Sequence, residues 1–262
     1  MTGTTGSLGP LALRASADEL DALAYGLTGV GFPGVGPSLV TAAAETHRAV
    51  VARRLLGSLI VRGVVEEAPD HWRISPAYQD LLATVLDPRQ AVSVRVRTPD
   101  SSAMAIVCQG PAGVVVHGAG PGGTHELRRV DDDLDTAVVT LLGVPDDDII
   151  GTRNDDRPVR LRYSALLRQL DEPVGVTACG FVAALADYRY TAKLIPFGRT
   201  GETYHVSSAV LVAGGTGPLW AATVQPDAAT DDPGTDADGW VTARPLLPAD
   251  LRDWLRGLDL AG

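Results

Sequence analysis

Alternating apolar and polar residues occur in two separate stretches of the chain, and turn residues interrupt each stretch. The first stretch covers residues 91–130 and the second covers residues 188–244, and each contains four short apolar runs. A period of two is typical of strands that bury one side and expose the other. The first run shows it most clearly, with Val92, Val94 and Val96 alternating with Ser93, Arg95 and Arg97. The pattern predicts two antiparallel meanders.

Helical spacing of apolar residues flanks both meanders. Helices are predicted over residues 16–28, 39–61, 76–87 and 132–142 around the first meander, and over 163–170, 180–188 and 248–258 around the second. Ser16 and Glu19 have the spacing of a capping box, and Gly63 is suited to end the longest helix. A helix–meander–helix order that occurs twice predicts a duplicated α+β fold with internal pseudo-two-fold symmetry.

The domain organisation follows from this repeat. We expect a flexible leader over residues 1–15, then two halves, 16–145 and 146–262, that form one composite domain. Residues 225–239 contain five aspartates and no basic residue, which predicts a mobile loop between two strands. No secretory signal is visible at the N-terminus and no apolar run approaches the ~20 residues of a membrane span. The sequence therefore predicts a cytosolic protein without a membrane span.

Composition narrows the possible partners. A net charge of −10 argues against binding to nucleic acid, because a basic surface is needed to neutralise phosphates. Lys193 is the only lysine, against twenty-one arginines, which indicates a GC-rich coding bias of the kind found in actinobacteria. Two cysteines, Cys108 and Cys179, do not make a disulfide framework.

Candidate catalytic and metal-binding residues are few. His117, His125 and Glu126 flank the loop 118–123 (GAGPGG), but no third ligand of matching geometry is near, so we expect surface polar residues and no metal. The loop lacks the lysine and hydroxyl of a phosphate-binding loop, which favours a simple connection between strands. No serine or cysteine lies in a nucleophile elbow. We expect a non-enzymatic protein without a cofactor; the alternative is an enzyme with a site between the two halves.

A second alternative is a winged-helix regulator that uses residues 39–78. Within this segment a helix, the run RGVV, an acidic turn and the run WRISP follow the order of a recognition helix and its wing. However, a helix that reads DNA presents several basic residues. Here Arg53, Arg54 and Arg62 are offset by Glu66, Glu67 and Asp70.

Tryptophans are concentrated in the second half of the chain. We predict a partner-binding surface formed by five apolar residues on the second meander and the last helix: Trp220, Trp240, Leu251, Trp254 and Leu258. The competing interpretation is that these residues pack the last helix onto the protein's own sheet.

The order of segments resembles the EspG family, the cytosolic chaperones of mycobacterial type VII (ESX) secretion systems. The resemblance lies in a long helix ending in LIVRGVV, then SPAYQDLLATVLDP and VSVRVR, and in the tail GWVTARPLLPADLRDWLRGL. It implies a quasi-two-fold α+β fold with a central antiparallel sheet and no catalytic chemistry. It also implies a helical PE–PPE secretion substrate as partner. The loops of the first meander are short and the acidic segment has no counterpart, so a WXG100-type helical hairpin is the alternative partner.

Overall fold

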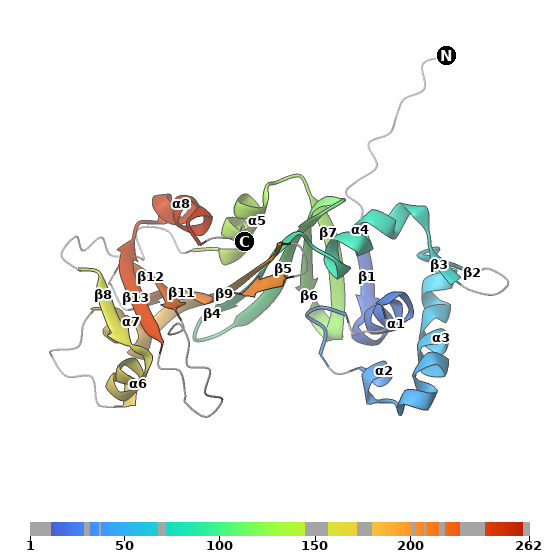
Figure 1. The fold of residues 1–262 in the computed structure, drawn as a ribbon, viewed down its shortest axis with the longest axis horizontal. Coiled ribbons are helices and arrows are strands. Elements are labelled where there is room, and N and C mark those ends of the chain that lie inside the picture. Colours follow the sequence, from blue (N-terminus) through green and yellow to red (C-terminus); the bar gives the residue numbers. More distant parts are fainter. Residues whose placement is uncertain are drawn as a thin grey trace, which may run out of the picture. The chain divides into compact units, whose positions relative to one another are not determined.

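The computed structural model describes residues 12–28, 32–36, 38–67, 72–144, 157–171, 180–200, 203–206, 208–214, 218–225 and 239–258 (Figure 1). The predicted acidic loop lies almost entirely outside the described residues, as do Cys179 and residues 1–11. No helix in the described ranges is long and apolar enough to cross a membrane.

Eight α-helices and thirteen strands are assigned within these ranges. The helices are α1 (Ala17–Thr28), α2 (Leu39–Ala42), α3 (Glu45–Val61), α4 (Pro76–Leu86), α5 (Leu134–Leu142), α6 (Tyr163–Asp171), α7 (Gly180–Ala186) and α8 (Leu251–Arg256). The strands are β1 (Ala12–Ser16), β2 (Val65–Glu67), β3 (Trp72–Ile74), β4 (Gln90–Arg97), β5 (Ser102–Gly110), β6 (Gly113–Ala119), β7 (Thr124–Val130), β8 (Val159–Arg162), β9 (Tyr188–Thr200), β10 (Thr203–Val206), β11 (Ser208–Gly214), β12 (Leu219–Gln225) and β13 (Trp240–Leu246).

The chain packs into two units that interleave in sequence. Unit 1 contains residues 1–89 and 105–137, and unit 2 contains residues 90–104 and 138–262. Strand β4 of the first predicted meander therefore packs with the strands of the second, and β5 and α5 have residues in both units. The predicted boundary near residue 145 and the single composite domain stay predictions.

In unit 1, β1, β7 and β6 pair antiparallel in that order, and β6 pairs with β5. Residues 12–15, expected as part of a leader, instead belong to β1. Their alternation explains the difference, since Leu13 and Ala15 are only 2% and 3% exposed and lie opposite Leu127 and His125. Two buried apolar side chains are enough to hold so short a strand in the sheet. The sequence therefore shows no long hydrophobic run at this point.

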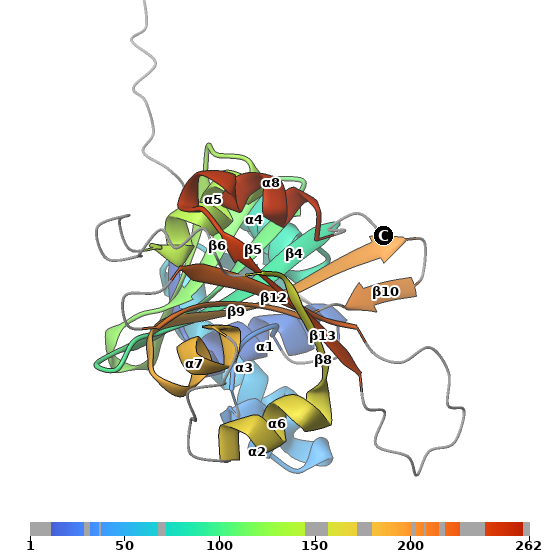
Figure 2. The ribbon, with the colours of Figure 1, turned by 90° about the vertical axis from the view of Figure 1, so that its left-hand side faces the viewer.

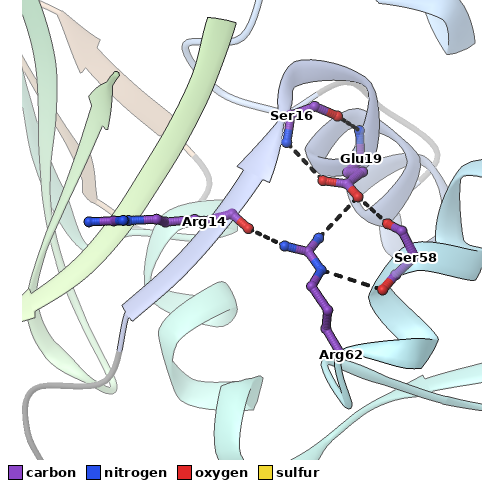
Figure 3. Close-up of polar contacts among 5 residues, drawn as sticks. All are labelled: Arg14, Ser16, Glu19, Ser58 and Arg62. Atoms are coloured by element: carbon purple, nitrogen blue, oxygen red, sulfur yellow. Dashed lines mark hydrogen bonds and ion pairs between the residues drawn. The ribbon is translucent and has the colours of Figure 1, made fainter. Parts of the chain in front are cut away.

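The predicted capping box is present and is extended by α3 (Figure 3). The Ser16 backbone amide donates to Glu19 Oε2 at 2.8 Å, and the Glu19 amide donates to Ser16 Oγ at 3.1 Å. Ser58 Oγ also donates to Glu19, and Arg62 Nη2 lies 3.0 Å from Glu19 Oε1. Burial raises the pKa of Glu19, but the hydrogen bonds from Ser58 and Ser16 and the Arg62 charge outweigh it, so the net shift is downward.

Arg62 also donates to the carbonyl oxygen of Arg14. The same guanidinium therefore ties α3 both to the first turn of α1 and to the backbone of β1 (Figure 3). Gly63 ends α3 as predicted, with φ of 70°. The Gly63 amide donates to the carbonyl oxygen of Ile60, and the Val64 amide donates to that of Leu59. This is the hydrogen-bonding pattern of a Schellman motif.

The long helix predicted over residues 39–61 is divided. Ala43 and Ala44 are extended, which separates α2 from α3. The segment before α2 is held by α1, because the buried Asp21 accepts hydrogen bonds from the Phe32 amide and the Ser38 hydroxyl. These two bonds place Phe32 against the sheet of unit 1.

The segment considered as a winged helix does contain a hairpin, formed by β2 and β3. Several of its charges are paired within the fold. Arg73 lies 2.6 Å from Glu66 and Arg53 lies 3.8 Å from Glu67, while Arg62 contacts Glu19. This pairing weighs against a surface that attracts phosphates.

In unit 2, six strands pair antiparallel in the order β4, β9, β11, β12, β13 and β8, and β10 pairs with β9. Helices α6 and α7 cover one side of these strands and α8 lies on the other (Figure 2). The core beneath α6 and α7 consists of nine buried residues: Leu166, Phe181, Val182, Ala184, Val212, Trp220, Ala222, Val241 and Ala243. The α+β class and the antiparallel meanders are confirmed.

The connectivity of the first part of the chain recurs in the second. In each, an outer strand (β1 or β8) leads into a helix, a later helix (α4 or α7) precedes four consecutively paired strands, and a helix follows. The last meander strand pairs with the outer strand in both cases, β7 with β1 and β13 with β8. This repeat agrees with the predicted duplication; superposition by a two-fold axis stays a prediction.

Candidate functional site

Three of the five predicted partner-binding residues are buried. Trp220, Leu251 and Trp254 are 1%, 2% and 7% exposed. Trp220 faces α7, with its ring centroid 5.9 Å from that of Phe181. In this conformation their side chains are not available to a partner, so the structure favours the competing interpretation of packing within the fold. The sequence could not separate the two because a short apolar helix face fits either role.

The other two predicted residues are accessible. Leu258 and Trp240 are both partly exposed. Trp240 begins β13, and the guanidinium groups of Arg160 and Arg162 on β8 lie 4.5 and 4.3 Å from its ring centroid. These cation–π contacts orient the indole at the outer strand of unit 2.

The histidine pair of unit 1 is an internal feature. His117 is 3% exposed, and its Nε2 lies 3.0 Å from Nδ1 of His125. Phe32 packs edge-on against His117, with ring centroids 5.6 Å apart. Burial and the neighbouring His125 lower the pKa of His117 to about 4, and burial also lowers that of His125. The expectation of surface polar residues is therefore wrong for His117.

The pair does not form a metal site with Glu126. Glu126 is on the opposite face of β7 from His125 and forms an ion pair with Arg14, 3.3 Å away. Within the described ranges, no three residues among histidine, cysteine, aspartate and glutamate gather as metal ligands. The loop between the histidines connects β6 to β7, as predicted. Within it, the Gly120 amide donates a hydrogen bond to the Thr124 carbonyl oxygen.

Helix α6 presents an apolar pair to solvent. Tyr163 and Leu167 are each 45% exposed and lie four residues apart, hence on the same side of the helix. Leu166 faces inward and joins the core under α6 and α7. Exposed apolar residues at helical spacing are suited to contact another protein.

A strip of cations lies on the sheet of unit 2, on the side that α6 and α7 cover elsewhere. Arg95 on β4 is directly opposite Lys193 on β9, and Arg97 and Arg189 extend the strip along these two strands. All four side chains are exposed. Lys193 is on the same face of the sheet as its cross-strand neighbour Val210 and the next residue across, Ala222. Ala222 belongs to the core under α7. In the sequence Lys193 stands out only as the single lysine, because its position opposite Arg95 depends on strand pairing.

Comparison with solved structures finds proteins of similar fold. The fold matches that of the Mycobacterium tuberculosis type VII secretion system chaperone EspG5, solved in complex with a PE25–PPE41 dimer. The chain has an EspG-like fold. The TM-score is 0.56 at 13% sequence identity, and the match covers 95% of this chain and 96% of the EspG5 chain. The sequence matches no protein-family model, and comparison with curated proteins gives no significant match.

Likeness over nearly the whole of both chains confirms the EspG-like fold that the order of segments indicated. At this level of identity the likeness concerns the fold alone, and no residue role passes from EspG5 to this chain.

The burial of Trp254 predicts a loss of stability on truncation. Replacing Trp254 with alanine removes a large buried side chain and should lower the free energy of unfolding by about 3–5 kcal/mol. Chemical denaturation measures this directly, with the exposed Arg252→Ala change on the same helix as control. If Trp254→Ala unfolds at the wild-type midpoint, the packing role is wrong.

The histidine pair predicts a specific pH dependence. Unfolded histidine titrates near pH 6.5, whereas folded His117 stays neutral down to about pH 4. The unfolded state then binds more protons in this window, so the free energy of unfolding should fall as the pH drops from about 6.5 towards 4. Denaturation between pH 7 and 5, above the range of ordinary carboxyl titration, measures the contribution of the pair, since burial lowers the pKa of His125 as well.

His117→Gln should reduce that dependence to the part that His125 contributes, and the same change at the exposed His47 serves as the control. An equally steep pH dependence in His117→Gln would contradict the assignment.

Proposed function

We propose that this protein is a non-enzymatic, cytosolic binding protein that keeps a helical substrate of a type VII secretion system soluble before export. The observation that carries the proposal is the fold, which matches a type VII secretion chaperone over 95% of the chain. That neighbour is described in complex with a PE25–PPE41 dimer. We propose a PE–PPE pair as the partner here, with a small WXG100-type hairpin as the alternative.

The chemistry of the surface supports this proposal. A chaperone needs accessible apolar side chains beside polar ones, and unit 2 offers Tyr163 and Leu167 on α6 and the cations of β4 and β9 on the same side of its sheet. Trp240 and Leu258 remain accessible on other parts of unit 2 and are kept as candidate contacts. Among the described residues, the pKa values of Cys108, His117 and Tyr190 are shifted most strongly, and burial in the fold is the main cause.

An enzyme would instead bring titratable groups together at an accessible pocket. The buried Cys108 thiol has its pKa raised to about 12, the opposite of what a nucleophile requires. The Tyr190 hydroxyl donates a hydrogen bond to the Leu142 carbonyl oxygen and so has a structural role. These groups therefore support a binding role over a catalytic one.

Co-expression tests the function. The chain should co-purify with a helical PE–PPE pair from the same genome and keep the pair soluble, as measured by affinity capture followed by size exclusion. Leu167→Glu should weaken capture at least about tenfold, because it places a charge in the apolar contact. Its exposure means that the melting temperature should change little.

The exposed Arg54→Glu change on α3 serves as control and should not affect capture. If neither PE–PPE nor WXG100-type pairs from that genome are captured by the wild-type chain, the proposed function is contradicted.

A further inference from the structure

We propose that the cation strip of β4 and β9, formed by Arg95, Arg97, Arg189 and Lys193, binds a carboxylate-rich helical segment of the protein partner. The inference deepens the proposed function, on which the identity of the partner rests. It assigns both a position on the sheet and a chemical class to the segment that docks there.

The arrangement of the strip is set by strand register. Arg95 lies opposite Lys193 and Arg97 lies opposite Thr191 in the antiparallel pairing of β4 with β9. Side chains two residues apart on a strand share a face, so Arg189, Thr191 and Lys193 line up along β9. The strip therefore presents four exposed cations on one face of two neighbouring strands.

No carboxylate within the described residues pairs with these cations. The side chain of Arg95 donates only to the sulfur of Met104, at 3.6 Å, and no ion pair involves the other three. Strands β4, β9 and β11 contain no aspartate or glutamate. The nearest acidic residues along the chain are Asp100, in the turn after β4, and Asp187, just before β9.

Such an arrangement is unfavourable for the isolated protein. Like charges directly opposite each other on paired strands are destabilising. The chain as a whole has ten more acidic than basic charges, so this local excess of cations opposes its general composition. A carboxylate placed between Arg95 and Lys193 would turn the repulsion into two charge-assisted contacts.

The flanking residues favour a protein segment over a nucleic acid. Ile195 and Val210 are half-buried beside the strip, and so is Phe197, the next residue of β9 on this face, so apolar side chains lie next to the cations. The overall acidic charge also repels phosphate backbones at longer range. An amphipathic helix with carboxylates on one side and apolar residues beside them matches both the cations and their half-buried neighbours.

The test uses a defined probe, so that it does not depend on finding the natural partner. A fluorescein-labelled helical peptide of about twenty residues carries glutamates in i,i+4 rows beside a leucine row, and a matched peptide has glutamine in place of each glutamate. A single-stranded DNA oligonucleotide of equal charge represents nucleic acid. Fluorescence anisotropy with the full chain measures binding to each.

We expect the glutamate peptide to bind at least about tenfold more tightly than the glutamine peptide and the DNA, with affinity that falls as salt rises. Lys193→Glu and Arg95→Glu should each weaken binding of the glutamate peptide about tenfold. Arg54→Glu changes the net charge equally on another surface and should have no effect.

Folding is controlled within the same series. Lys193→Glu replaces a like-charge pair with an opposite-charge pair, so its melting temperature should equal or exceed that of the wild type. Equal binding of the two peptides, stronger binding of DNA, or an unchanged affinity in both reversal variants would overturn the inference. Failure of co-purification alone would contradict the proposed function. Whether the strip binds a carboxylate-rich helix would still be tested by the peptide measurement.

Discussion

The pairing of β4 with β9 is the constraint on which unit 2 depends. The two strands pair over eight residues, and one face of the pair is buried, with Val92, Val94, Ala192 and Leu194 at most 2% exposed. Burying each of the larger side chains stabilises the fold by about 1.5–3 kcal/mol. A slip of β4 by one residue would turn its side chains over and bring Arg95 to the buried face in place of Val94. The alternation that builds the core therefore also fixes the cations on the outer face.

Unit 1 is held by polar contacts as well as by its apolar core. Glu19 and Arg62 connect the start of α1, the end of α3 and the backbone of β1. Asp21 holds the segment before α2 against α1, which places Phe32 on His117. These contacts join residues far apart in sequence, and each places a charged or polar group where burial without a partner would be costly.

Local sequence patterns were enough to predict most of the fold. Period-two alternation identified β4, the Ser16–Glu19 spacing identified the capping box, and Gly63 marked the end of α3. The strands β1 and β8 were missed because four or five residues give too little periodicity to detect. The break after α2 was missed because Ala43 and Ala44 are good helix formers in isolation.

The candidate site was harder to predict because it depends on pairing and burial. The tryptophans drew attention by their chemistry, yet Trp220 and Trp254 are used in the core. Arg95 and Lys193 are 98 residues apart in sequence, and only the register of β4 and β9 brings them face to face. No spacing rule within a single strand could have found that pair.

The central claim is that this cationic face of unit 2 contacts the partner, and Lys193 allows it to be tested directly. As the only lysine in the chain, it supplies the only side-chain amine for a zero-length carbodiimide cross-link to a carboxylate. After cross-linking of the purified complex, mass spectrometry should find Lys193 joined to an aspartate or glutamate of the partner. A stable complex in which Lys193 forms no cross-link to the partner would contradict the account.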